Sequence, residues 1–151
     1  MVNNAGIFLG REFEGATDAD WDKIVAVNLK GVYLGTKLCA PALRKRGKSS
    51  PHGSAIVNLA SIAGLVGSQL DPIYSMTKGG VTLFTKSTAL AFGRKGDRIR
   101  VNSIHPGVIE TDMGAQTFCR EQCRWAATTS RPSRINPANF IPSAVLVYPM
   151  I

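Results

Sequence analysis

A tyrosine and a lysine four residues apart form the pair in this sequence with the clearest chemical potential. Tyr74 and Lys78 fall in the stretch DPIYSMTKGG, residues 71–80, which has the pattern of a helix start. Residues at positions i and i+4 share one helix face. The lysine ammonium would therefore lie near the phenol and lower its pKa from the usual value of about 10. A phenol tuned in this way can take the proton of an alcohol, although the pair alone could equally be an incidental surface contact.

Two further polar residues strengthen the interpretation as an active site. Ser61 ends a predicted strand just before this helix, and its hydroxyl could hydrogen-bond the same substrate oxygen. Asn28 lies in VAVNLKGV, in the middle of a predicted helix, where asparagine is a poor helix former. A buried amide needs hydrogen-bond partners. Taken singly, Ser61 could be a turn former and Asn28 a satisfied core amide; together with Tyr74 and Lys78 they favour an active site.

The elements that must position these residues alternate along the chain. Residues 1–7 resemble the end of a strand, and residues 16–47 have the pattern of a helix with Thr17 as N-cap. Pro41 should kink or shorten this helix. Its apolar residues cover a wide arc, so we expect burial on more than one side; they are Ile24, Val27, Val32, Leu34 and Leu38.

A strand is predicted at residues 54–61, a helix from about Pro72 to Phe92 with Gly93 at its end, and a strand at residues 98–107. Strand-helix alternation favours an α/β fold with a parallel sheet. Ligands bind beyond the carboxyl ends of such strands. The polar residues that follow each strand should gather there, including Asn3, Ser61 and His105.

Size and composition limit the possible classes of protein. The chain has 151 residues, 44% of them apolar, which suits one globular domain. No apolar stretch is long enough to span a membrane, and the first residues do not resemble a signal peptide. Cys39, Cys119 and Cys123 have no metal-ligand spacing. We therefore expect free thiols, a cytoplasmic location and no bound metal.

The net charge of +8 does not by itself indicate nucleic-acid binding. One basic cluster, RKRGK at residues 44–48, ends a predicted helix, where cations complement the helix dipole. No aromatic residues alternate with it to stack on bases. We therefore expect neither a nucleic-acid nor a membrane partner.

Several motifs together closely resemble the short-chain dehydrogenase/reductase family. They are NNAG at 3–6, Asn28, Ser61, YSMTK at 74–78 and IRVNSIHPGVIETDM at 99–113, in the family's order. The segment NSIHPG is similar to the corresponding segment of family members that act on cyclic alcohols or hydroxysteroids. The resemblance implies an α/β fold with a partial Rossmann-type, doubly wound parallel sheet that lacks the first strands and the glycine-rich turn. Residues 1–113 would be the central and catalytic part of that NAD(P)-binding domain.

The resemblance also implies roles for individual residues and a small-molecule alcohol or ketone as substrate. Tyr74 would be the general acid/base, Lys78 would lower its pKa and bind the nicotinamide ribose, Ser61 would hold the substrate oxygen, and Asn28 would anchor a water of a proton relay. The cofactor would be NAD or NADP, with NAD favoured. Its two ends would contact Asn3, Ala5 and Gly6 on the adenosine side, and Pro106, Gly107, Ile109 and Thr111 at the nicotinamide.

The sequence departs from the family pattern at both ends. The turn TGxxxGxG is absent, and residues 114–151 do not follow the pattern, so we expect an irregular or disordered tail there. A catalytically inactive fragment that keeps only the fold and dimerisation surfaces is therefore an alternative. The helices that carry Asn28 and Tyr74 would form the dimer face. Leu65, Val66 and Leu70 could line an apolar substrate pocket or simply pack within a loop.

Overall fold

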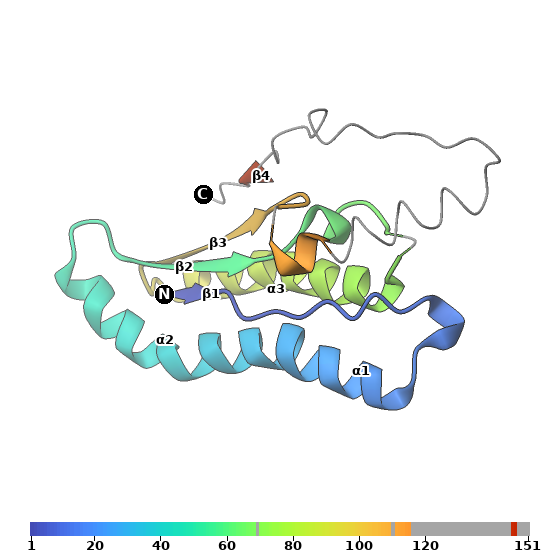
Figure 1. Cartoon of the computed structure of the whole chain (residues 1–151). Coiled ribbons are helices and arrows are strands. Elements are labelled where there is room, and N and C mark those ends of the chain that lie inside the picture. The colour runs from blue at the N-terminus through green and yellow to red at the C-terminus, as the bar shows by residue number, and fades with distance from the viewer. Residues whose placement is uncertain (69, 110, 116–145, 148–151) are drawn as a thin grey trace.

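Three parallel strands alternate with two long helical segments in the computed structural model, which describes residues 1–68, 70–109, 111–115 and 146–147 (Figure 1). Strands β1 (Val2–Asn3), β2 (Ser54–Leu59) and β3 (Ile99–His105) lie side by side in chain order. Val2 pairs with Val57, and Ile56 pairs with Val101. The predicted α/β class with a parallel sheet is therefore confirmed.

A fourth short strand joins the free side of β3. Strand β4 (Leu146–Val147) pairs antiparallel with it, Val147 opposite Ile104 and Leu146 opposite His105. An edge strand offers unpaired backbone groups to a strand of either direction. This short strand corrects the expectation of irregular structure for those two residues. Gly114 and Ala115 are also regular, since they belong to a helical turn over residues 112–115. The remaining residues of that expectation, 116–145 and 148–151, lie outside the described residues, and the division at residue 113 stays a prediction.

Helix α1 (Asp18–Val25) begins with the predicted N-cap. The Thr17 hydroxyl accepts a hydrogen bond from the Asp20 backbone at 3.1 Å, and the Asp20 carboxylate accepts one from the Thr17 backbone at 3.1 Å. This reciprocal capping box satisfies two backbone donors that the first turn leaves unpaired.

A π-helical turn, Ala26–Lys30, joins α1 to α2 (Gly31–Ser49) and keeps one stripe of residues against the sheet. From residue 24 to residue 40 the buried residues of this segment recur every four positions: Ile24, Asn28, Val32, Thr36 and Ala40. In a regular α-helix, four residues turn the chain by about 400°, so each buried residue would be rotated by about 40° around the helix axis relative to the one before it. A wider turn rotates less per residue, so it reduces the drift where Asn28 enters the interior.

Two expectations for this segment need correction. Pro41 does not shorten α2, which continues to Ser49, and a kink there stays a prediction. Pro41 and Lys37, whose carbonyl loses its helical partner, are both exposed, so water can bond that carbonyl. Burial on more than one side is also contradicted, because Leu34 is 38% and Leu38 is 72% exposed. Apolar residues outside the four-residue stripe face away from the sheet.

Helix α3 (Pro72–Arg94) begins at Asp71, whose carboxylate accepts the backbone N–H of Tyr74. Gly96, not the predicted Gly93, ends it. Gly96 has a φ of 66°, its N–H donates to the Gly93 carbonyl, and the Asp97 N–H donates to the Phe92 carbonyl. This pattern of bonds needs a left-handed residue just after the C-cap. Gly93 lies three positions before Gly96, inside the last turn.

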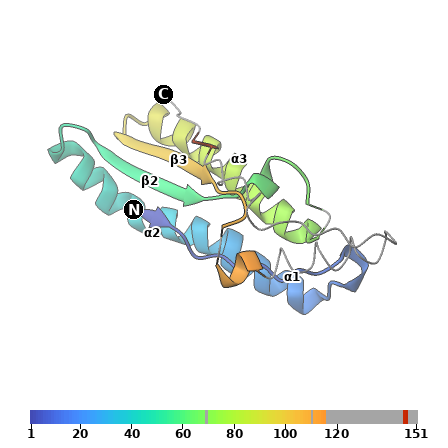
Figure 2. The same cartoon turned by 45° about the horizontal axis from the view of Figure 1, so that its top comes forward.

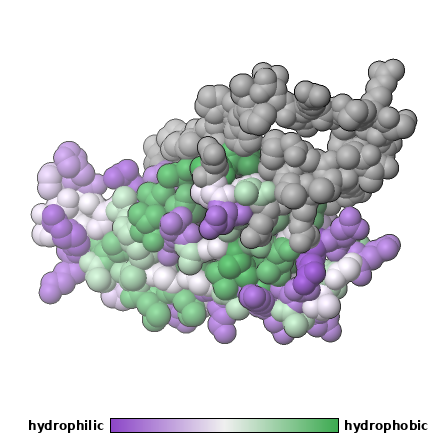
Figure 3. Space-filling view, in the orientation of Figure 1, coloured by the Kyte–Doolittle hydropathy of each residue, from purple (hydrophilic) through white to green (hydrophobic). Residues whose placement is uncertain are grey.

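The helices cover one face of the sheet (Figures 1 and 2). Alternate residues of β2 and β3 point toward them, among them Ile56 and Val101, which pack with Ala40 and Phe92. Val32, Ala60 and Val81 form a second cluster nearer the carboxyl ends of the strands. The other face of the sheet is less covered by described residues: Val2 is 62% exposed, and Figure 3 shows apolar surface there.

Hydrophilic surface gathers where α2 ends and β2 begins (Figure 3). The basic cluster at residues 44–48 lies there, as predicted, at the end of a helix. None of the helices in the described part of the chain is long and apolar enough to cross a bilayer.

Candidate active site

The cavity at the carboxyl ends of β1, β2 and β3 brings most of the predicted site residues together. Its volume is about 970 Å³. Predicted residues that line it are Gly6, Ser61, Tyr74, Lys78, Pro106, Gly107, Ile109 and Thr111. Parallel strands all end at this edge, so residues far apart in the sequence meet here. Asn3, Ala5 and Asn28 do not line the cavity.

Tyr74 projects from the first turn of α3. Burial raises the pKa of its phenol; a hydrogen bond with Ser61 lowers that pKa and the negative charge of Asp71 raises it. We had expected Lys78 to lower this pKa. Its ammonium lies over the ring, with Nζ 5.7 Å from the ring centroid, and the shift is upward because burial outweighs the other effects.

Lys78 lies one helical turn further on and is only 5% exposed. Its Nζ donates a hydrogen bond to the carbonyl of Leu59, the last residue of β2, at 2.8 Å. Burial lowers the pKa of this ammonium to about 8. The remaining N–H groups of the ammonium can serve a ligand in the cavity.

The lowered pKa of Lys78 predicts a characteristic dependence of stability on pH. Its value of about 8 in the fold lies below the ordinary 10.5, so between these two pH values the unfolded chain binds more protons. The free energy of unfolding should therefore rise with pH across this window, by up to about 3 kcal/mol. Urea unfolding at pH 7.5 and 10.5 should show the rise in the natural chain and not in Lys78→Met. The exposed Lys45→Met is the control; an equal rise in Lys78→Met would contradict the prediction.

Ser61 is held at the end of β2 in an extended conformation, with a φ of −168°. Its Oγ accepts the N–H of Ala63 at 3.1 Å, so its own proton can point to the cavity. The fully buried His105 fixes its backbone, since Nδ1 lies 3.2 Å from the Ser61 carbonyl and Nε2 lies 2.8 Å from the Ser103 hydroxyl. A carbonyl only accepts; Nδ1 therefore carries the proton, and in the neutral ring Nε2 accepts from Ser103.

Asn28 is a buried amide with several hydrogen bonds. Its Oδ1 accepts the N–H of Ile7 at 2.8 Å, and its Nδ2 lies 3.0 Å from the Ile7 carbonyl and 3.1 Å from the Thr77 hydroxyl. It therefore ties the loop after β1 to the helix that carries Tyr74. Gly6 brings that loop close to both polar groups: a Cβ there would lie 3.2 Å from Lys78 Nζ and 3.6 Å from Asn28 Oδ1. The proton relay through Asn28 stays a prediction.

Asn3 has a structural role in this fold. Its Nδ2 donates to the Asn58 side chain at 2.8 Å and to Thr36 at 3.3 Å, and Asn58 in turn donates to Thr85. This chain of polar side chains links α2, β1, β2 and α3. The family resemblance implies a place for Asn3 beside the cofactor, but in the fold its side chain bonds Asn58 and Thr36 instead.

Other features of the described residues set limits on the chemistry. They contain no group of three or more histidine, cysteine, aspartate or glutamate side chains that could hold a metal ion. Cys39 is a free thiol, whereas Cys119 and Cys123 lie outside the described residues. Further apolar residues line the cavity without having been singled out from the sequence, among them Phe8, Ile62, Val108 and Met113.

Comparisons with known proteins find similar sequences and similar folds. The sequence profile of the short chain dehydrogenase family matches residues 1–122. The chain is 41% identical over 116 residues to a cyclopentanol dehydrogenase of Comamonas sp. (strain NCIMB 9872), covering 77% of this chain and 44% of that one. It is 42% identical over 113 residues to a 3-alpha-(or 20-beta)-hydroxysteroid dehydrogenase of Mycobacterium bovis, covering 75% and 41%.

Among solved structures, ElxO with NADP bound is similar, with a TM-score of 0.67 and 32% identity over 80% of this chain and 46% of that one. The chain thus spans less than half the length of the curated relatives and solved structure described here. These similarities confirm the resemblance to dehydrogenases of cyclic alcohols and hydroxysteroids.

Proposed function

The chain belongs to the short-chain dehydrogenase family, and on that premise we propose that it transfers hydride between NAD(P) and a secondary alcohol or ketone. One observation carries the proposal: Ser61, Tyr74 and Lys78 line a single cavity at the carboxyl ends of the strands. This arrangement supports acid/base chemistry on a substrate oxygen.

Each side chain has a distinct task in the proposed reaction. Ser61 donates its hydroxyl proton to the substrate oxygen, because its Oγ already accepts from Ala63. Tyr74 gives a proton to that oxygen during reduction and takes it back during oxidation. Lys78, held by the Leu59 carbonyl, directs its other N–H groups to the cofactor ribose. The nicotinamide, when bound, supplies or accepts the hydride.

The described residues fit the nicotinamide end of such a cofactor. Gly6 lets the backbone approach Lys78 where a Cβ would be only 3.2 Å from Nζ. The same cavity is lined by Pro106, Gly107, Ile109 and Thr111. The preference for NAD that we expected has no support from the comparisons, since the solved relative holds NADP. We therefore propose NAD(P) without a preference.

An apolar alcohol, cyclic or steroidal, suits the cavity. Its wall includes Phe8, Ile62, Val66, Val108 and Met113. Val66 lines the cavity, whereas Leu70 is a core residue at 6% exposure and does not. The names of the cyclopentanol and hydroxysteroid relatives point to the same class of substrate.

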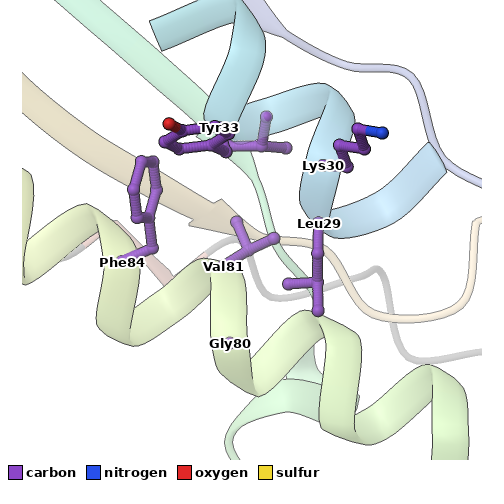
Figure 4. Close-up of a pocket in the computed structure, with 7 residues that line it drawn as sticks. Leu29, Lys30, Tyr33, Gly80, Val81 and Phe84 are labelled. Carbon is purple, nitrogen blue, oxygen red and sulfur yellow. The ribbon is translucent and has the colours of Figure 1, made fainter. Parts of the chain in front are cut away.

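The apolar surface of α2 and α3 favours a second copy of this chain as the binding partner. An apolar groove of about 380 Å³ lies between them, lined by Leu29, Val32, Tyr33, Val81 and Phe84 (Figure 4). Leu38, Leu83 and Leu90 on the same helices are each at least 65% exposed. We propose that this face pairs with a second copy in the cytoplasm, without nucleic-acid or membrane partners. The same face supports the second candidate function, an inactive chain that keeps its dimerisation surface.

Cofactor titration separates the two candidate functions. We expect NADH and NADPH fluorescence to change saturably as the purified chain is added, followed by turnover of cyclopentanol or a hydroxysteroid with the oxidised cofactor. Size-exclusion chromatography would report the dimer independently. No binding up to millimolar cofactor, with an intact dimer peak, would support the inactive chain instead.

A further inference from the structure

The loop Ile7–Gly10 lies against the first turn of α3 and contacts it through several groups. The ring of Phe8 packs edge-on against the ring of Tyr74, with centroids 5.3 Å apart and planes at 87°. Such edge-to-face pairs add a preferred geometry to apolar burial. Phe8 also lines the cavity, so the position of this loop affects both the shape of the cavity and the setting of Tyr74.

Asp71 holds the far end of this loop. Its Oδ2 accepts the backbone N–H of Gly10 at 2.9 Å and of Leu9 at 3.3 Å, while its Oδ1 accepts the backbone N–H of Tyr74 at 2.8 Å. One carboxylate thus bridges two segments sixty residues apart in the chain. Asn28 holds the near end of the loop through Ile7, so Phe8 lies between two anchors.

The demands of helix capping do not explain this carboxylate. An N-cap needs one side-chain oxygen, and serine, threonine or asparagine supplies it as well as aspartate does. Asp71 is 1% exposed, and burying a charge is costly unless donors satisfy it. Its second oxygen, Oδ2, serves the loop and not the helix.

We propose that Asp71 is a positioning residue for Tyr74: its carboxylate fixes the loop Ile7–Gly10, and with it the Phe8 ring, against the turn from which the tyrosine projects. The importance of this role rests on the proposed function of Tyr74 as acid and base. The geometry itself is independent of that function and can be tested without cofactor or turnover.

The charge of Asp71 gives the role a measurable signature, because it raises the pKa of the Tyr74 phenol. Other ionisable groups of the described residues near this phenol are Lys78 on the same helix, His105 behind Ser61, and Asp112 on the cavity wall. Residues 4–10 and 61–67 carry no ionisable side chain. On α1, Asp18, Asp22 and Lys23 are exposed, and Asp20 is engaged with Thr17 and Arg11.

Alkaline titration of tyrosine absorbance provides the test. The chain has three tyrosines, so a Tyr33→Phe, Tyr148→Phe background reports Tyr74 alone. We expect Asp71→Asn, which keeps a capping oxygen and loses the charge and the second acceptor, to lower the titration midpoint by about half a pH unit or more. Phe8→Leu should also lower it, because the phenol becomes less buried, and the two effects should not add in the double variant.

Thr17→Ala is the matched control, since it removes the N-cap of another helix away from the cavity. Its midpoint should equal that of the background. An unchanged midpoint in Asp71→Asn, an equal shift in Thr17→Ala, or fully additive effects of Asp71→Asn and Phe8→Leu would each overturn the proposal. If Asp71→Asn does not fold, Phe8→Leu carries the test, and an unchanged midpoint there overturns it. A failed cofactor titration would refute the proposed function and leave this result standing.

Discussion

Replacement of Tyr74 by phenylalanine is expected to lower kcat/KM for alcohol oxidation by about 10³-fold or more. The substitution removes only the phenolic oxygen, which is the group that exchanges a proton with the substrate in the proposed reaction. A positioned acid or base typically contributes 10² to 10⁴ in rate. The ring, its edge-on contact with Phe8 and the start of α3 should be preserved. Steady-state kinetics with a cyclic alcohol measure the effect.

The control for this variant is Tyr33→Phe, which makes the same change in the groove between α2 and α3, outside the cavity that holds Tyr74. Its activity should match that of the natural chain. Cofactor affinity, measured by NADH fluorescence, should stay within about threefold in Tyr74→Phe, because a proton-transfer group contributes to the transition state and little to ground-state binding. A Tyr74→Phe chain with more than a tenth of the natural activity would show that another group moves the proton.

A methyl group at Gly64 is expected to destabilise the fold and to misalign the site. A Cβ at this position would lie 2.6 Å from the Lys78 carbonyl carbon, 2.7 Å from its oxygen and 2.8 Å from the Gly79 nitrogen. All three are backbone atoms of α3, so the turn Ile62–Gly64 must move away from the helix. We expect Gly64→Ala to cost about 2–3 kcal/mol of stability, in the range of overpacked cores.

The activity of Gly64→Ala should fall together with its stability. The turn Ile62–Gly64 follows Ser61 directly, and α3 carries Tyr74 and Lys78. A displacement of about 1 Å can cost about 10²-fold in rate. Gly79→Ala is the matched control on the opposite side of the same contact: its Cβ would meet only the Gly64 carbonyl, at 3.6 Å. That variant should be as stable as the natural chain or more so, because alanine favours a helix interior. Urea unfolding and steady-state kinetics on Gly64→Ala and Gly79→Ala test the prediction. Equal free energies of unfolding in the two variants would contradict it.

The sequence predicted those features that depend on local pattern. Strand and helix order follows from hydrophobic periodicity, and the capping residue Thr17 follows from the acidic residues after it. The gathering of Ser61, Tyr74 and Lys78 follows from a general property of parallel sheets, that their carboxyl ends share one edge.

Features that depend on contacts between distant segments could not be predicted. The internal role of Asn3 requires Asn58 and Thr36 beside it, and the close contact at Gly64 requires the path of α3. The pKa of Tyr74 was expected to fall because spacing shows which charge is near but not how deeply the phenol is buried. Asp71 looked like an ordinary capping residue, since its second set of partners lies in the loop after β1.

The π-helical turn between α1 and α2 constrains the number of residues in this segment, and the buried Asn28 constrains their identity at one position. Each residue of a regular helix turns the chain by about 100°, so eight regular residues from Ile24 to Val32 would overshoot two full turns by about 80°. The wider turn absorbs this excess and keeps both residues on the sheet side. Insertion of a further codon within Ala26–Lys30 would rotate Val32, Thr36 and Ala40 away from the sheet relative to Ile24. Loss of one codon would leave about 700°, so an ordinary α-helix would keep these residues facing the sheet. In the genetic drift of such a chain, a substitution or loss at exposed Ala26 or Lys30 is tolerable, whereas an insertion is not.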